Sequence, residues 1–166
     1  GDFTVNIALV SHGDPIRGIV YAPARQRLFY TNENGEAVEE VGFFGVSKVG
    51  SIKRIKTALS DNKALRVVAS KSHRDKKTDQ YISKYSCKEF VSAGSSLKFC
   101  FIAAGEADFY PRFGPTMEWD TAAGHSVLSA AGGRVLQAEN KKPLMYGKPN
   151  FRNPHFIADT ANVILR

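Results

Sequence analysis

The chain has 166 residues, of which 43% are hydrophobic and 23% charged, a composition typical of one soluble globular domain or a large piece of one. It shows no charged-then-apolar leader and no apolar run long enough to span a bilayer, which argues against secretion and against a transmembrane segment. The net charge of +7 predicts attraction to anions such as nucleotides, nucleic acid or acidic membrane surfaces, without choosing among them.

The first third of the chain has the pattern of an antiparallel meander. Residues 3–10 and 16–23 are apolar or alternating runs around a Gly-Asp-Pro turn, as in two adjacent strands. Residues 27–31 and 37–41 flank an Asn-Glu-Asn-Gly segment whose Asn-Gly step suits a hairpin. The Gly-rich, basic stretch that follows has no element assigned to it.

The rest of the chain alternates between strand and helix patterns. Ser95 is expected near the N-cap of one helix, and the Gly132-Gly133 pair ends another. The predicted helices are residues 74–85, 95–104 and 118–131. The predicted strands are residues 65–70, 87–92, 107–111, 134–137 and 155–159, with a loop at 141–154.

Residues 119–124, Trp-Asp-Thr-Ala-Ala-Gly, place an aspartate at the start of a helix. In the first helical turn, backbone N–H groups and the helix dipole keep a carboxylate ionised and fixed, which suits a metal ligand. Ala122, Ala123 and Gly124 are small enough to let this helix approach its neighbours, so Asp120 is expected at the floor of a cleft. Taken by itself, the same aspartate is an ordinary helix cap.

This segment, with the Ala-Gly-Gly at 131–133, resembles the second signature of the inositol monophosphatase superfamily, W-D-x-A-A-G followed by A-G-G. The 3'(2'),5'-bisphosphate nucleotidase branch fits more closely, because four further segments match it in order. They are GDFTVNIALV at 1–10, ASKSH at 69–73, GSSLKF at 94–99 and YPRFGPT at 110–116. The resemblance covers most of the chain. It implies an α/β (α+β) fold: the C-terminal half of a layered αβαβα sandwich, with a mixed sheet and antiparallel front strands.

The resemblance also implies roles for five residues. Asp120 binds a divalent ion and contacts the attacking water or the phosphate, and is therefore catalytic. His73, Ser95, Lys98 and Arg112 match positions that hold the sugar and phosphates of a nucleotide. Lysine and arginine are suited to this role, since both donate charge-assisted hydrogen bonds to phosphate oxygens. Taken singly, these residues are surface cations and a plain helix cap, and it is their joint occurrence in order that favours a site.

The implied reaction is magnesium-dependent hydrolysis of adenosine 3',5'-bisphosphate to AMP and phosphate, as part of sulfate assimilation. Such a metal site needs several carboxylates, and this chain supplies one in a convincing context. The other metal carboxylates of the family come from an upstream glutamate motif and from D-P-x-D-G-T, and neither appears here. Asp14-Pro15-Ile16-Arg17-Gly18 has an arginine where the second aspartate must stand, and is interpreted as an ordinary turn.

We therefore expect that an N-terminal half is absent from this chain and is its structural complement. Residues 1–60 are then the remainder of the first sheet region, and residues 61–166 a second α/β subdomain. The 166 residues alone are expected to be inactive. Exposed apolar surface and strand edges predict self-association.

Two other functions stay open. An inositol or sugar monophosphate phosphatase of the same superfamily is the nearer one, although Lys98 and Arg112 favour a substrate with two phosphates. A basic, non-enzymatic nucleic-acid binding module would use the charge of +7 and the interspersed aromatic residues. No RNP, KH or helix-turn-helix pattern supports it, so the expected partner is a small nucleotide and not nucleic acid.

The remaining polar and aromatic residues receive structural interpretations. His12, His125 and His155 lack the spacing and the carboxylates of a zinc site. Trp119 is interpreted as a core anchor for its helix and not as a base-stacking residue.

Localisation is predicted from cysteine usage. Cys87 and Cys100 are the only cysteines, with neither dense pairing nor CxxC spacing. This favours a reducing, cytoplasmic setting, and the basic charge leaves peripheral contact with a membrane open.

Overall fold

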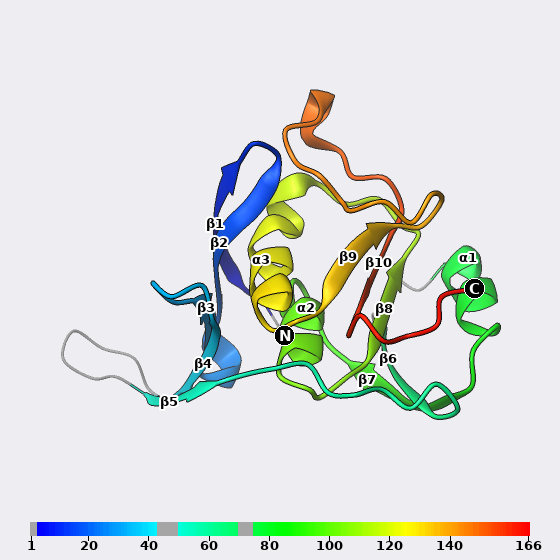
Figure 1. Cartoon of the computed structure of the whole chain (residues 1–166), viewed down its shortest axis with the longest axis horizontal. Coiled ribbons are helices and arrows are strands. Elements are labelled where there is room, and N and C mark those ends of the chain that lie inside the picture. Colours follow the sequence, from blue (N-terminus) through cyan, green and yellow to red (C-terminus); the bar gives the residue numbers. More distant parts are fainter. Residues whose placement is uncertain (1–2, 43–49, 70–74) are drawn as a thin grey trace.

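The computed structural model describes residues 3–42, 50–69 and 75–166, which form two β-sheets and three α-helices (Figure 1). Helices α2 (Leu97–Ala103) and α3 (Ala122–Ala130) pack between the two sheets. Helix α1 (Lys76–Ile82) packs on the outer face of the second sheet, at the far side of the molecule from the first sheet. The described layers therefore run sheet, helices, sheet, helix.

The first sheet is an antiparallel meander in the order β1-β2-β3-β4-β5. Its strands are β1 (Val5–Ser11), β2 (Asp14–Ala22), β3 (Arg27–Thr31), β4 (Ala37–Val41) and β5 (Ser51–Arg54). The four predicted strands are confirmed. Strand β5 was not predicted, because its four side chains are all exposed and leave no apolar alternation in the sequence.

A tight hairpin turn joins β1 to β2. His12 and Gly13 both have positive φ, 51° and 88°, as a two-residue hairpin turn requires. Asp14 follows directly as the first residue of β2. The Asp-Pro step thus begins β2, directly after an ordinary strand-to-strand turn at His12 and Gly13.

The second sheet is mixed, in the order β7-β6-β8-β10-β9. Its strands are β6 (Leu65–Ala69), β7 (Cys87–Ser92), β8 (Phe109–Arg112), β9 (Arg134–Gln137) and β10 (Phe156–Asp159). Strand β6 pairs in parallel with β7 and β8, whereas β10 is antiparallel to β8 and β9. The expected α+β fold with a mixed sheet and antiparallel front strands is confirmed.

Small residues bring α3 close to its neighbours on both sides. A Cβ added to Gly18 of β2 would lie 2.3 Å from the carbonyl oxygen of Ala123, and one added to Gly124 would lie 2.7 Å from the ring of Phe99. Phe99 then stacks on Phe156 of β10, with ring centroids 5.7 Å apart. Both phenylalanines are buried, so the first sheet, the helices and the second sheet share one core.

The outer face of the first sheet carries exposed apolar side chains. Because side chains alternate along a strand, Val5, Ile7 and Leu9 of β1 point away from α3, together with Ile19 of β2 and Ile52 of β5. All five are exposed. The αβαβα order is thus present as four layers, and the described residues do not form a helical layer outside the first sheet.

The start of α2 differs from the prediction by two residues. The helix begins at Leu97 with Ser96 at its N-cap, because Ser95 takes a left-handed conformation with φ of 49°. This conformation is uncommon for a serine and lies outside a helix. Ser95 is consequently exposed at the end of the loop that leads into α2.

Candidate functional site

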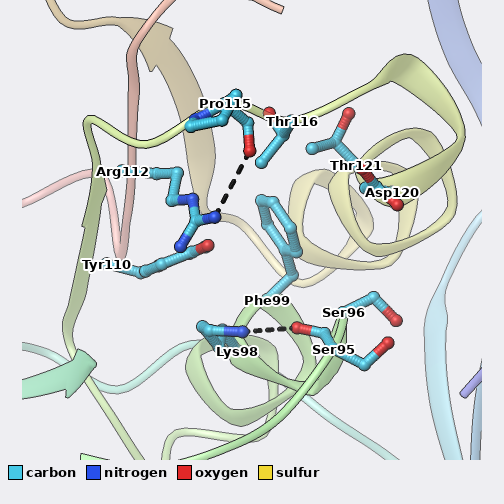
Figure 2. Close-up of a pocket in the computed structure, with 10 residues that line it drawn as sticks. All are labelled: Ser95, Ser96, Lys98, Phe99, Tyr110, Arg112, Pro115, Thr116, Asp120 and Thr121. Atoms are coloured by element: carbon cyan, nitrogen blue, oxygen red, sulfur yellow. Dashed lines mark hydrogen bonds between the residues drawn. The ribbon is translucent and has the colours of Figure 1, made fainter. Parts of the chain in front are cut away.

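One cavity brings together four of the five site residues expected from the sequence. It has a volume of about 220 Å³ and lies between the start of α2, the end of β8 and the segment before α3 (Figure 2). The residues that line it are Ser95, Ser96, Lys98, Phe99, Tyr110, Arg112, Pro115, Thr116, Asp120 and Thr121. The fifth expected residue, His73, lies outside the described residues.

Lys98 contributes a positive charge from within the cavity wall. It lies in the first turn of α2 and is only 6% exposed. Its Nζ donates a hydrogen bond of 2.6 Å to the carbonyl oxygen of Ser95 and lies 5.4 Å from the centre of the Tyr110 ring. A cation held in a buried wall favours an anionic ligand, because the charge is poorly solvated there.

Arg112 ends β8 and lines the cavity beside the loop that follows. Its Nη2 donates to the carbonyl oxygen of Pro115 at 3.3 Å, whereas its buried Nε has no hydrogen-bond partner among the described residues. A Cβ on Gly114 would lie 3.3 Å from Cζ of Arg112, so the glycine leaves room for the guanidinium. Buried donors are normally paired, and a phosphate oxygen is a suitable partner for this one.

The charge of Arg112 also acts on the N-cap of α1. Burial by itself would raise the pKa of Asp75, but hydrogen bonds from Thr78 and the nearby guanidinium lower that pKa below its ordinary value. The start of α1 thus lies within electrostatic range of the cavity.

Asp120 lies on the side of the cavity opposite the two cations (Figure 2). It ends a 3-10 turn, Glu118–Asp120, and Thr121, with φ of −124°, separates that turn from α3. The expected place of Asp120 in the first turn of a long helix was therefore wrong. Its Oδ2 accepts a hydrogen bond of 2.8 Å from the N–H of Met117, and the side chain is exposed. The carboxylate is thus held at one oxygen and accessible to a ligand.

The first sheet reaches the cavity through the two serines before α2. The hydroxyl of Thr4 is hydrogen-bonded to those of Ser95 and Ser96, at 2.6 and 2.9 Å, and Ser96 donates to Oδ1 of Asn6 at 2.5 Å. Thr4, Asn6 and Ser96 were not predicted as part of the site. The available signal was the alternation of Thr4 and Asn6 with apolar residues in and before β1, which puts both on one face.

Trp119 is not a core anchor. It is 61% exposed and packs against Phe151, with ring centroids 6.2 Å apart. The buried residue of the turn is Glu118, whose carboxylate accepts hydrogen bonds from the backbone N–H groups of Gly147 and Lys148, both at 2.9 Å. The 3-10 turn directs the glutamate inward and the tryptophan outward.

His125 has the structural role expected of it. Its Nδ1 lies 3.0 Å from the hydroxyl of Tyr146, and burial lowers its pKa to about 4, so the imidazole is neutral at physiological pH. His12 and His155 are exposed.

The cavity offers one carboxylate toward a metal ion. In the three described ranges, no group of three or more His, Cys, Asp or Glu side chains is placed to hold a metal. Asp120 is the acidic residue among those that line the cavity. Magnesium prefers oxygen ligands and needs its charge balanced, so Asp120 fits as one ligand, whereas a complete site needs further carboxylates.

Two further findings bear on the setting of the protein. Cys87 and Cys100 are free thiols. Among the described residues, no helix has the length and apolar character needed to cross a membrane.

The chain is similar to proteins of one family. The sequence model described as the inositol monophosphatase family matches residues 1–163. The 3'(2'),5'-bisphosphate nucleotidase CysQ of Shigella flexneri and that of Escherichia coli K12 are each 45% identical to this chain over 157 residues, which is 94% of this chain and 59% of theirs. The crystal structure of CysQ from Bacteroides thetaiotaomicron superposes with a TM-score of 0.85 at 40% identity, over 96% of this chain and 63% of that one. The chain thus spans about three fifths of the length of these relatives.

Proposed function

Because this chain belongs to the inositol monophosphatase family, we propose that the protein containing it is a magnesium-dependent 3'(2'),5'-bisphosphate nucleotidase. It converts adenosine 3',5'-bisphosphate to AMP and phosphate. The family comprises magnesium-dependent phosphoric monoester hydrolases. The observation that carries the proposal is the convergence of Ser95, Lys98, Arg112 and Asp120 on one cavity.

The two cations and the serine form the nucleotide-binding side. Lys98 and Arg112 bind phosphate oxygens, and Nε of Arg112, which has no partner within the described part of the chain, is the donor left for this purpose. Ser95 offers its hydroxyl, and His73 is proposed for the same side on the resemblance alone. A bisphosphate uses both cations, whereas an inositol or sugar monophosphate needs fewer, which supports the nucleotide as substrate.

Asp120 forms the reacting side. In the hydrolysis, a water oxygen bonds to phosphorus as the bond from phosphorus to the ribose 3' oxygen breaks, and a proton passes to the departing oxygen. Asp120 contacts the water or the phosphate and is one magnesium ligand. Magnesium, when bound, supplies charge neutralisation and a more acidic water. The remaining ligands are proposed to come from residues outside this chain, because the described residues offer one carboxylate here.

The rest of the protein is proposed to cover the first sheet. Relatives are longer than this chain, and the exposed face formed by Val5, Ile7, Leu9, Ile19 and Ile52 suits a further buried layer. In this organisation, residues 1–60 complete the first sheet region and residues 61–166 form a second α/β subdomain. The free thiols support a reducing, cytoplasmic location.

The experiment compares substrates in the protein that includes its upstream residues. Phosphate release is measured with magnesium from adenosine 3',5'-bisphosphate and from inositol 1-phosphate, for the wild type and Asp120→Asn. We expect the bisphosphate to be hydrolysed far faster, and the variant to lose most of that activity. Faster release from inositol 1-phosphate would indicate the sugar phosphatase. Salt-dependent binding of an oligonucleotide with no hydrolysis would indicate the nucleic-acid module.

A further inference from the structure

The turn that carries Asp120 is held by a side chain from a distant loop. Asn153 lies between the 3-10 turn Pro149–Phe151 and β10, and is only 7% exposed. Its Nδ2 donates to the carbonyl oxygen of Met117 at 2.8 Å and to the hydroxyl of Thr121 at 3.0 Å. Its backbone N–H donates to the carbonyl oxygen of Thr116 at 3.0 Å. One residue therefore holds both ends of the segment 116–121.

Met117 connects Asn153 to Asp120. The N–H of Met117 donates to the Asp120 carboxylate, and its carbonyl oxygen accepts from Asn153. If the Asn153 amide were lost, the peptide groups on either side of Met117 could rotate and the carboxylate would lose its fixed donor. Asn153 does not line the cavity, so its influence on a ligand there must pass through this turn.

The side-chain nitrogen and the side-chain oxygen of Asn153 differ in their hydrogen bonding. Its Oδ1 is buried and has no hydrogen-bond partner in the ranges that the structure describes, which offsets part of what the donor bonds contribute. We therefore expect the amide to matter more to the conformation of residues 116–121 than to the stability of the whole fold.

We propose that Asn153 is the positioning residue for Asp120, fixing the turn 116–121 so that the carboxylate faces the cavity. The inference rests on the proposed function for its consequence in catalysis, but the ordering of the turn can be measured without it.

Asn162 provides a matched comparison. Its side chain also joins two segments, accepting from the N–H of Ser60 at 3.1 Å and donating to the Ser60 carbonyl oxygen at 3.0 Å, beyond the other end of β10.

The test is amide hydrogen exchange, followed by mass spectrometry on peptides that span 116–121, in this chain. Asn153→Leu keeps the number and branching of the side-chain heavy atoms and removes the donors, and Asn153→Asp serves if the leucine variant does not fold. We expect exchange in these peptides to become about tenfold faster, the factor that corresponds to the loss of a buried hydrogen bond. Asn162→Ala is expected to leave them unchanged and to speed exchange around residue 60.

Unchanged exchange at 116–121 in the Asn153 variants, or equal acceleration there in Asn162→Ala, would overturn the proposal. A separate measurement addresses the proposed function: the magnesium concentration for half-maximal activity of the protein with its upstream residues. We expect Asn153→Leu to raise it, and Asn162→Ala to leave it unchanged. If Asp120→Asn retained full activity, the proposed function would fail while the exchange result stood.

Discussion

The hydroxyl of Thr4 lies 2.6 Å from that of Ser95, although the two residues are 91 positions apart in the chain. Thr4 precedes the first strand of the first sheet, and Ser95 precedes α2, which packs on the second. The cavity is therefore built where the two sheet regions meet, and each region contributes to the position of its walls.

Arg112 should determine affinity for the second phosphate of the substrate. In Arg112→Gln, loss of the charge and of the Nε donor should weaken binding of adenosine 3',5'-bisphosphate by roughly 1.5–3 kcal/mol, the usual contribution of a hydrogen bond to a charged group. Titration calorimetry of the bisphosphate and of AMP measures this, and AMP binding should weaken less. Arg54→Gln is the control, because Arg54 is exposed and pairs with Glu36 outside the cavity. Equal losses in the two arginine variants would argue against a phosphate contact.

His125 should make the fold less stable in mild acid. Its pKa is lowered by burial to about 4, below the ordinary value of 6.5, so between these two pH values the unfolded state binds a proton that the folded state does not. The free energy of unfolding must then decrease as pH falls from about 6.5 to 4, by about 3 kcal/mol for this residue. Denaturant unfolding at several pH values measures the decrease. His125→Leu should reduce it, whereas His155→Gln, which alters an exposed histidine, should not.

The outer face of the first sheet should drive self-association of the 166-residue chain. Ile7 and Leu9 are 60% and 57% exposed on neighbouring positions of that face. The double substitution Ile7→Glu and Leu9→Glu should shift the chain toward monomer in sedimentation velocity, because charges oppose burial of this face. Leu59→Glu changes a residue that is 89% exposed away from the sheet and should have no such effect. A monomeric wild-type chain at micromolar concentration would contradict the prediction.

The fold followed from local patterns wherever those patterns were strong. The apolar or alternating run at 3–10 and the segments 27–31 and 37–41 beside the Asn-Gly step form strands as predicted. The Gly132-Gly133 pair ends α3 as expected, with Gly132 at φ of 94°. Strand β5 escaped prediction because an exposed edge strand has no apolar periodicity. The prediction that Trp119 lies in the core was wrong, because in the 3-10 turn it is Glu118 that is buried while Trp119 is exposed. Helix boundaries are poorly determined by sequence.

The sequence motifs pointed to the charged residues of the candidate site but not to the residues that support them. Lys98, Arg112 and Asp120, which the motifs singled out, line one cavity, and their binding and catalytic roles stay predictions. Asn153 and Thr4 were not found, because their role depends on contacts with segments far away in the chain, and no local spacing encodes those contacts. His73 stays a prediction.

The most direct test of the account is phosphate release from adenosine 3',5'-bisphosphate with magnesium, measured in parallel for the 166-residue chain and for the protein that includes its upstream residues. We predict steady release by the longer protein and none by the chain alone, because Asp120 is the one carboxylate that the described residues bring to the cavity. Turnover by the chain alone at the rate of the longer protein would contradict the account, as would the absence of release by both.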